Sequence, residues 1–141
     1  MRDMTPDERR AFLLEGTRTG KLAVTRRDGS PHVVPIWFLL DGDDVVFNTH
    51  RTTLKGRAIR RTGRLAICVD DERPPYAYVA VEGRATVSED PGELLDWATR
   101  IAARYMGGDL AEAYGRRNGG PGELLVRLAP EWLQAKAGVA D

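Results

Sequence analysis

Short apolar segments separated by tight-turn residues make up most of this sequence. KLAVTRR at 21–27 and PHVVPIWFLL at 31–40 flank Asp28-Gly29, a dipeptide typical of two-residue hairpin turns. DGDD at 41–44 marks the next turn, and VVFNT at 45–49 follows as a third strand. No helix separates these strands, so the pattern does not fit a doubly wound parallel sheet and favours antiparallel strands.

Three further segments complete the expected sheet. RLAICVDD at 64–71 predicts a strand buried on both faces, and YAYVAVEGRATV at 76–87 and ELLVRLAPEWLQAKA at 123–137 predict two more. Five or six strands, mostly joined by tight turns, predict a mainly β fold of the α+β class in which an antiparallel sheet closes towards a barrel. With no repeat or linker, residues 1–141 are expected to form a single domain.

Two or three helices are expected around the sheet. TPDERRAFLLEG at 5–16 begins with a helix-capping pattern, and ELLDWATRIAARYM at 93–106 has apolar residues at a 3.6-residue period. GGDLAEAYGRRNGGPG at 107–122 is interpreted as a glycine-rich connection to the last strand. The helix that carries Trp97 and Tyr105, together with this connection, is expected to cover the mouth of a cleft.

The chain is neutral and rich in arginine. Its 21 basic residues balance 21 acidic residues, which argues against general nucleic-acid binding because that normally needs a basic domain. No apolar run approaches the roughly 20 residues that span a bilayer. Residues 1–12 lack the apolar region of a signal peptide, so a cytoplasmic protein without a membrane partner is expected. The single cysteine, Cys68, excludes an internal disulfide.

One segment departs from this even charge distribution. Between Arg51 and Arg64 the chain has six basic residues and no acidic one. A helix that begins near Thr52 or Thr53 would present free backbone N–H groups and the positive end of its dipole to an anion. Thr49 and Thr53 could add hydroxyl donors and Lys55 an ammonium group. The segment predicts a site for a small anionic ligand, and a solvated basic helix is the alternative.

No residues are arranged as a recognised catalytic or metal site. His32 and His50 have no partner at metal-ligand spacing, so no metal is expected. The glycine pairs form neither a dinucleotide-binding nor a P-loop motif. Tyr76, Tyr78 and the two histidines are the available proton donors, and none is singled out as catalytic. If the chain is an enzyme, a cofactor is expected to carry the chemistry.

The order of three segments resembles a known family. GKLAVTRRDGSPHVVPIWF, VVFNTHRTTLKGRAIRRTGRLAICVDD and YAYVAVEGRATV, within Gly20 to Val87, resemble the flavin/deazaflavin-dependent oxidoreductases. These are split β-barrel proteins related to pyridoxamine 5′-phosphate oxidase. The resemblance implies an antiparallel split barrel and an oxidoreductase that transfers a hydride between its cofactor and a small organic substrate, whose identity the sequence does not indicate.

The resemblance also implies a set of cofactor-binding residues. It assigns the cofactor phosphate to the residues after the third strand and the ring to the second strand. Family members are homodimers with the cofactor at the interface, which places Tyr78 of the partner subunit near the ring. Ordinary core packing is the alternative for the ring residues, Ile36 above all. The phosphate residues are Thr49, Thr53 and Lys55 with Arg51 nearby, and the ring residues are Val34, Pro35, Ile36 and Trp37.

Two departures indicate the branch of the family. Pyridoxamine phosphate oxidases have an arginine directly before the phosphate lysine, where this chain has Leu54, and an Arg-x-His motif near the C-terminus, which this chain lacks. Oxidation of vitamin B6 is therefore not expected, and Leu54 is expected beside the cofactor. The deazaflavin coenzyme F420 continues past its phosphate into an anionic oligoglutamate tail. Arg57, Arg60 and Arg61 suit this tail, which favours F420 over FMN.

The sequence is also compatible with other functions. An FMN-binding oxidoreductase of the same family is the first alternative, and a non-catalytic carrier of a cofactor or tetrapyrrole is the second. Binding of single-stranded nucleic acid is disfavoured because residues 51–64 contain no aromatic side chain on which a base could stack.

Overall fold

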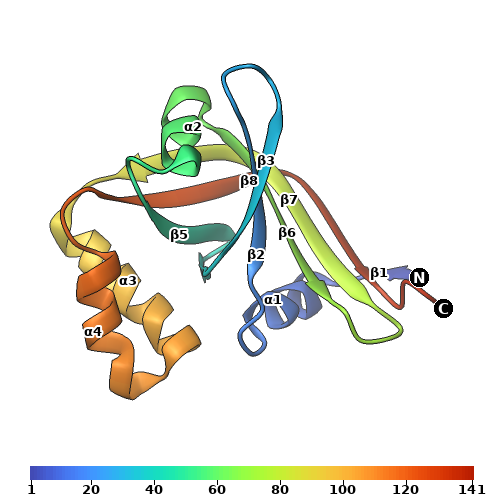
Figure 1. Cartoon of the computed structure of the whole chain (residues 1–141). Helices are drawn as coiled ribbons and strands as arrows, with labels where there is room; N and C mark the ends of the chain where they lie inside the picture. Colours follow the sequence, from blue (N-terminus) through green and yellow to red (C-terminus); the bar gives the residue numbers. More distant parts are fainter.

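The computed structural model describes residues 1–141. Eight strands form one sheet, and four helices lie around it (Figure 1). The elements are β1 (Arg2–Asp3), α1 (Pro6–Leu14), β2 (Gly20–Thr25), β3 (Pro31–Ile36), β4 (Leu39–Asp41), β5 (Asp44–His50), α2 (Leu54–Thr62), β6 (Arg64–Asp71), β7 (Ala77–Ser88), α3 (Pro91–Met106), α4 (Gly108–Asn118) and β8 (Glu123–Ala137).

The sheet is antiparallel throughout and has the order β3-β2-β6-β7-β8-β5-β4, with β1 paired to the end of β8. The long strands β7 and β8 form its middle, and β8 pairs with β7 along its length and with β5 at its beginning. A bulge between Glu82 and Gly83 bends this pair. A Cβ atom on Gly83 would lie 2.0 Å from the carbonyl oxygen of Ala129, so the bend requires glycine. The expected antiparallel split barrel is confirmed.

The expected strand at 31–40 is broken at its centre. β3 ends at Ile36 on one edge of the sheet and β4 begins at Leu39 on the other, so the bend between them closes the barrel. Phe38 is fully buried in this bend. Its amide donates to the Tyr105 hydroxyl at 3.3 Å and its carbonyl accepts from Arg104 at 2.8 Å. Side chains of α3 thus replace the ladder hydrogen bonds that the bend removes.

The main core lies inside the barrel and contains eighteen buried apolar residues. On β6, Leu65, Ile67 and Val69 are buried, whereas Ala66 and Cys68 between them are only half-buried. The expectation that this strand is buried on both faces is wrong for the single chain, because no layer covers its outer face. Small side chains at alternate positions gave the strand its continuous apolar appearance.

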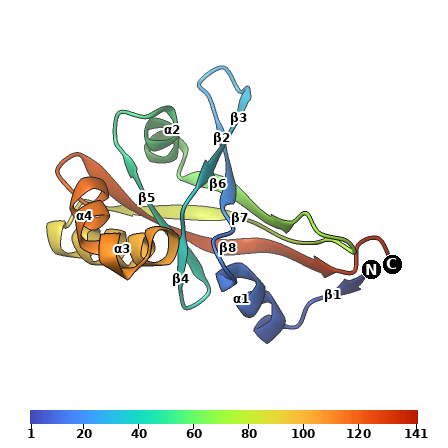
Figure 2. The same ribbon diagram turned by 60° about the horizontal axis from the view of Figure 1, so that its bottom comes forward.

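The helices lie around the sheet, as Figure 2 shows. On α2, Ala58 and Ile59 are buried against the main core. Trp97 of α3 packs with Val46 and Leu125 in a second, smaller core, so it is a core residue and not part of a cleft mouth. No helix is long and apolar enough to cross a membrane.

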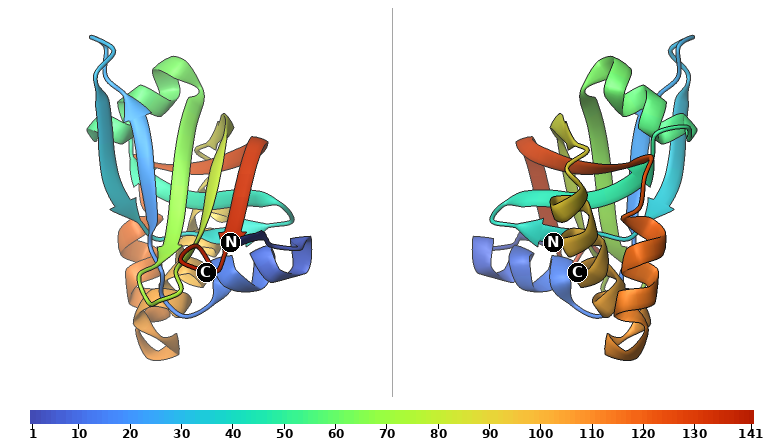
Figure 3. Two further views of the ribbon diagram at one scale, coloured as in Figure 1. Left: turned by 90° about the vertical axis from the view of Figure 1, so that its right-hand side faces the viewer. Right: turned by 90° about the vertical axis from the view of Figure 1, so that its left-hand side faces the viewer.

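The glycine-rich stretch 107–122 is wrongly interpreted from the sequence as a connection. Most of it forms α4, which packs against α3 (Figure 2). Gly115 allows this approach, because an added Cβ would lie 2.1 Å from Oγ1 and 2.9 Å from Cα of Thr99. At the other end of the molecule, β1 pairs with β8 and the two chain termini lie together (Figure 3).

Candidate cofactor-binding site

The first turn of α2 is held by the side chain of Thr53, its N-cap. The Thr53 hydroxyl donates to the His50 carbonyl at 2.7 Å and accepts from the Gly56 amide at 3.1 Å. The buried hydroxyl of Thr49 lies 3.1 Å from it. Gly56 is required here, because an added Cβ would lie 2.5 Å from the His50 carbonyl oxygen. The turn is therefore a fixed junction between β5 and α2.

This turn leaves two backbone donors free. The hydrogen bonds of the chain engage the amides of Thr53, Gly56 and Arg57 but not those of Leu54 and Lys55. The side chain of Lys55 has no hydrogen-bond or ion-pair partner either, and it lines a cavity beside the turn. Free amides at a helix N-terminus next to an ammonium group form a favourable environment for a phosphate.

We call this space the β5–α2 cavity; its volume is about 330 Å³. It brings together six of the residues expected at the cofactor and five others. The expected residues are Pro35, Ile36, Trp37, Thr49, Thr53 and Lys55, and the others are Asn48, His50, Arg117, Asn118 and Glu123. The expected ring segment and the expected phosphate residues therefore border the same space.

Aromatic side chains from α3 and α4 hold Trp37 at the edge of the cavity. The Trp37 ring stacks on Tyr105, with centroids 5.1 Å apart and planes 2° from parallel, and Tyr114 lies at 6.2 Å. The Tyr105 hydroxyl donates to the carbonyl of Arg18 at 2.7 Å, which fixes the ring. The α3–α4 pair thus supports one wall of the cavity, but of the helix and stretch expected to cover the cleft only Arg117 and Asn118 line it.

The charges in the cavity are mixed. Lys55 and Arg117 are cationic, and the Arg117 guanidinium lies 5.5 Å from the centre of the Tyr114 ring. The amide of Thr52 donates to Nδ1 of His50 at 3.3 Å. Burial raises the pKa of the Glu123 carboxyl, while the nearby His50 and Lys55 act to lower it. No ion pair engages Glu123.

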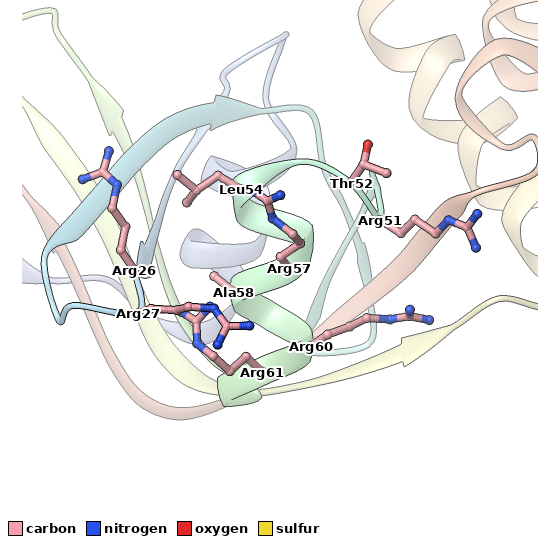
Figure 4. Close-up of a pocket in the computed structure, with 9 residues that line it drawn as sticks. All are labelled: Arg26, Arg27, Arg51, Thr52, Leu54, Arg57, Ala58, Arg60 and Arg61. Atoms are coloured by element: carbon pink, nitrogen blue, oxygen red, sulfur yellow. The ribbon is translucent and has the colours of Figure 1, made fainter.

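A larger cavity of about 890 Å³ lies on the other side of the same turn, and we call it the arginine groove (Figure 4). Six arginines line it and no acidic residue does. It contains five of the residues expected at the cofactor, Arg51, Leu54, Arg57, Arg60 and Arg61, and in addition Arg26, Arg27, Thr52 and Ala58. Arg26 and Arg27 come from the β2–β3 hairpin, which faces α2 across the groove (Figure 4).

The arginines differ in how they are held. Arg60 pairs with Glu89 at 2.6 Å and points away from the hairpin (Figure 4). Arg61 donates to the carbonyl of Thr25 at the end of β2. Arg26 donates to the carbonyl of Pro31 at 3.1 Å. The remaining three, Arg27, Arg51 and Arg57, have no side-chain hydrogen bond or ion pair within the chain.

Two expected residues line neither space. Val34 pairs with Leu22 on the core-facing side of β3 and is half-buried. Tyr78 lies on β7, where its hydroxyl donates to Oε1 of Gln134 at 3.0 Å. Its expected place beside the ring of a partner subunit stays a prediction. Within one chain, the structure does not bring these two residues to the cavity.

Several site residues were missed from the sequence. Arg117 and Asn118 are the last residues of α4, a helix that was not predicted because its glycines are typical of a loop. The side-chain amide of Asn48 donates to the Asn118 carbonyl. Arg26 and Arg27 precede the Asp28-Gly29 turn, which predicts the hairpin but not its packing across α2. Glu123 begins β8 opposite His50. Only strand register, which the sequence does not reveal, could have placed Glu123 at the site.

Comparison with protein families agrees with this geometry. The model of the family described as pyridoxamine 5′-phosphate oxidase matches residues 5–137. The chain belongs to this family. The expected relation to the flavin/deazaflavin-dependent members of the pyridoxamine 5′-phosphate oxidase family is thereby confirmed.

Three individual proteins are similar to this chain. An F420H(2)-dependent biliverdin reductase of Mycobacterium tuberculosis is 30% identical over 99 residues, which are 70% of this chain and 71% of that protein. A solved structure of an F420 reductase is 27% identical, with a TM-score of 0.73 over 87% of this chain and 94% of that one. A conserved hypothetical protein of Mycobacterium tuberculosis is 22% identical, with a TM-score of 0.84 over 96% and 86% of the two chains. The last of these supports the fold alone.

Proposed function

We propose that the chain is an oxidoreductase that uses coenzyme F420 to transfer a hydride to or from a small organic substrate. The observation that carries the proposal is the arginine groove, in which six cationic side chains gather without an acidic residue. The two F420-dependent relatives support the same cofactor.

The two spaces fit the two anionic parts of this cofactor. Thr53 and Lys55 line the β5–α2 cavity, while the intervening Leu54 and the preceding Thr52 line the arginine groove. A phosphate at the first turn of α2 would therefore lie directly beside the groove, and a chain of glutamates that continued from it would extend towards the arginines. FMN ends at its phosphate and has no group that would occupy the groove.

The residues present would hold the cofactor and leave the chemistry to it. When bound, F420 supplies a hydride donor or acceptor at its ring. Pro35, Ile36 and Trp37 offer an apolar edge against which the ring can lie, and the Tyr105 stack holds Trp37 in place. Their part is to orient the ring and keep water from it. No side chain is assigned here as a proton donor.

The protein is proposed to act as a homodimer. The outer face of the sheet is uncovered: Val33 and Trp132 are 60% and 49% exposed, and Ala23, Ala66 and the exposed Glu82 lie between them in the strand register. Pro35, which lines the cavity, is on β3 two residues from Val33 and thus on the same face. A second copy that covered this face would lie beside the cavity, as a cofactor site at the dimer interface requires.

Two measurements test these proposals. Titration of the purified protein with F420 and with FMN, followed by fluorescence, should give tighter binding of F420, and the preference should decrease as salt rises. Equal affinities that do not respond to salt would favour the FMN alternative. Light scattering should give about twice the chain mass of 15.6 kDa. A stable monomer at working concentrations would contradict the dimer.

A further inference from the structure

Glu123 is an acidic residue in a cavity that is otherwise suited to an anion. It lines the β5–α2 cavity together with Lys55, Arg117 and His50. Its Cα lies opposite that of His50 in the β5–β8 ladder. A carboxylate at this position weakens the binding of any anionic ligand, so the presence of Glu123 is not explained by tighter binding.

The position of Glu123 is fixed by the chain around it. The Glu123 amide donates to the Gly120 carbonyl at 3.2 Å, and the Gly122 carbonyl accepts from the Arg51 amide at 2.9 Å. Gly122 has a φ of +87°, and an added Cβ there would lie 2.5 Å from Nε2 of His50. This segment is therefore fastened to the same turn that would bind the phosphate, and Glu123 cannot move far from it.

The Glu123 carboxyl forms no ion pair with any one of the cationic side chains around it. Burial raises the pKa of the carboxyl, and Coulomb interactions with His50 and Lys55 oppose this effect, yet no basic nitrogen lies within ion-pair distance. Lys55 and Arg117 supply two positive charges, and the Glu123 carboxylate removes one. These three side chains together leave one net positive charge, in addition to the helix dipole.

We propose that Glu123 sets the phosphate charge that this site accepts, favouring a phosphodiester monoanion over a phosphomonoester dianion. A monoester carries about −1.5 to −2 charges near neutral pH, whereas a diester carries one. The phosphate of F420 is a diester and that of FMN is a monoester. Because Coulomb repulsion grows with the charge of the ligand, Glu123 repels the FMN phosphate about twice as strongly. The assignment of the natural cofactor rests on the proposed function.

The test compares two ligands that share one ring. FMN and its phosphate methyl ester differ by one charge and a methyl group, and both are titrated at pH 8 and low salt. Glu123→Gln keeps the shape of the side chain and removes its charge. It should raise affinity for the methyl ester about threefold and for FMN about tenfold. Doubling the ligand charge doubles the repulsion energy that the substitution removes, and this squares the factor by which affinity increases. Glu123→Asp should keep the discrimination of the parent.

Glu131→Gln is the matched control, because Glu131 lies on the same strand but outside the cavity, near Arg64 and Arg84. It should leave both affinities unchanged. Equal gains for the two ligands in Glu123→Gln, no gain, or a loss would overturn the proposal. Failure of the parent to bind F420 while it binds both flavins would refute the proposed function and leave the Glu123 comparison valid. If the parent bound F420 but Glu123→Gln left the ratio of the two flavin affinities unchanged, the proposed function would stand and the role of Glu123 would be refuted.

Discussion

The hydroxyl oxygens of Thr49 and Thr53 lie 3.1 Å apart, and the Thr53 hydroxyl lies 2.7 Å from the carbonyl of His50. The carbonyl can only accept, so Thr53 donates to it and the Thr49 hydroxyl donates to Thr53. Both protons are then used within the protein. In this geometry the two threonines shape the proposed anion site, and the donors left for a phosphate would be the amides of Leu54 and Lys55 and the Lys55 ammonium group.

Thr53→Ala should therefore weaken both the fold and the site. It removes an N-cap that accepts from the Gly56 amide, a loss that typically costs about 1 kcal/mol of stability. Denaturant unfolding would measure this change, and cofactor titration the accompanying loss of affinity. Thr53→Ser retains the hydroxyl and should stay close to the parent in both. A fully stable Thr53→Ala protein would contradict the role of the cap.

Lys55→Ala should impair cofactor binding and leave the fold intact. The side chain is half-exposed and has no partner within the chain, so its removal opens no core cavity. A charge-assisted contact to phosphate is worth about 1.5–3 kcal/mol, or roughly 10- to 100-fold in affinity. Lys55→Arg preserves the charge and should lose much less. If Lys55→Ala bound F420 as well as the parent, the phosphate assignment would be wrong.

Arg57→Ala should affect only a cofactor that carries the glutamate tail. Arg57 lines the groove without a partner, whereas Arg60 is paired with Glu89. We expect a loss of several-fold for F420 in Arg57→Ala, a smaller loss in Arg60→Ala, and none for FMN in either. Titrations of both variants with both cofactors would measure this. Equal losses for F420 and FMN would mean that the groove does not hold the tail.

Gly115→Ala should separate α4 from α3 and disturb the cavity at a distance. The added methyl group meets both the side chain and the backbone of Thr99, and such overpacking typically costs about 1–3 kcal/mol. The shift would displace Arg117, which α4 carries into the cavity, and weaken cofactor binding. Gly108→Ala is the control, because an added Cβ there meets nothing within 4 Å. Comparable stability and binding in the two variants would contradict the close packing at Gly115.

Much of the fold could be predicted because local signals agreed with the final structure. The expected strands at 64–71 and 123–137 coincide with β6 and β8, and the 3.6-residue period identified α3. α4 was missed because the glycines at its ends and centre resemble a loop. One of them, Gly115, is present for helix packing, which a local pattern cannot distinguish from a turn.

The candidate site was predictable where one segment supplied it. Thr49, Thr53 and Lys55 lie in the cavity because β5 leads directly into α2. Residues that arrive from distant segments, such as Arg27 and Glu123, depend on how the hairpin and β8 pack, and no local signal in the sequence contains that information. The bend between β3 and β4 was also not predictable, because the backbone of Phe38 in this bend forms its hydrogen bonds with side chains of α3.

The arginine groove has a consequence for how fast a ligand is captured. The chain carries no net charge, so the positive charge of the groove is balanced by acidic groups elsewhere on the surface, and the molecule is an electric dipole. A distant anion is not drawn towards the protein as a whole, but within a Debye length it is turned towards the groove. Dissolved salt should therefore slow association more than it speeds release. Bulky polyanions such as nucleic acids, which need a broad basic surface, should gain little from so confined a field.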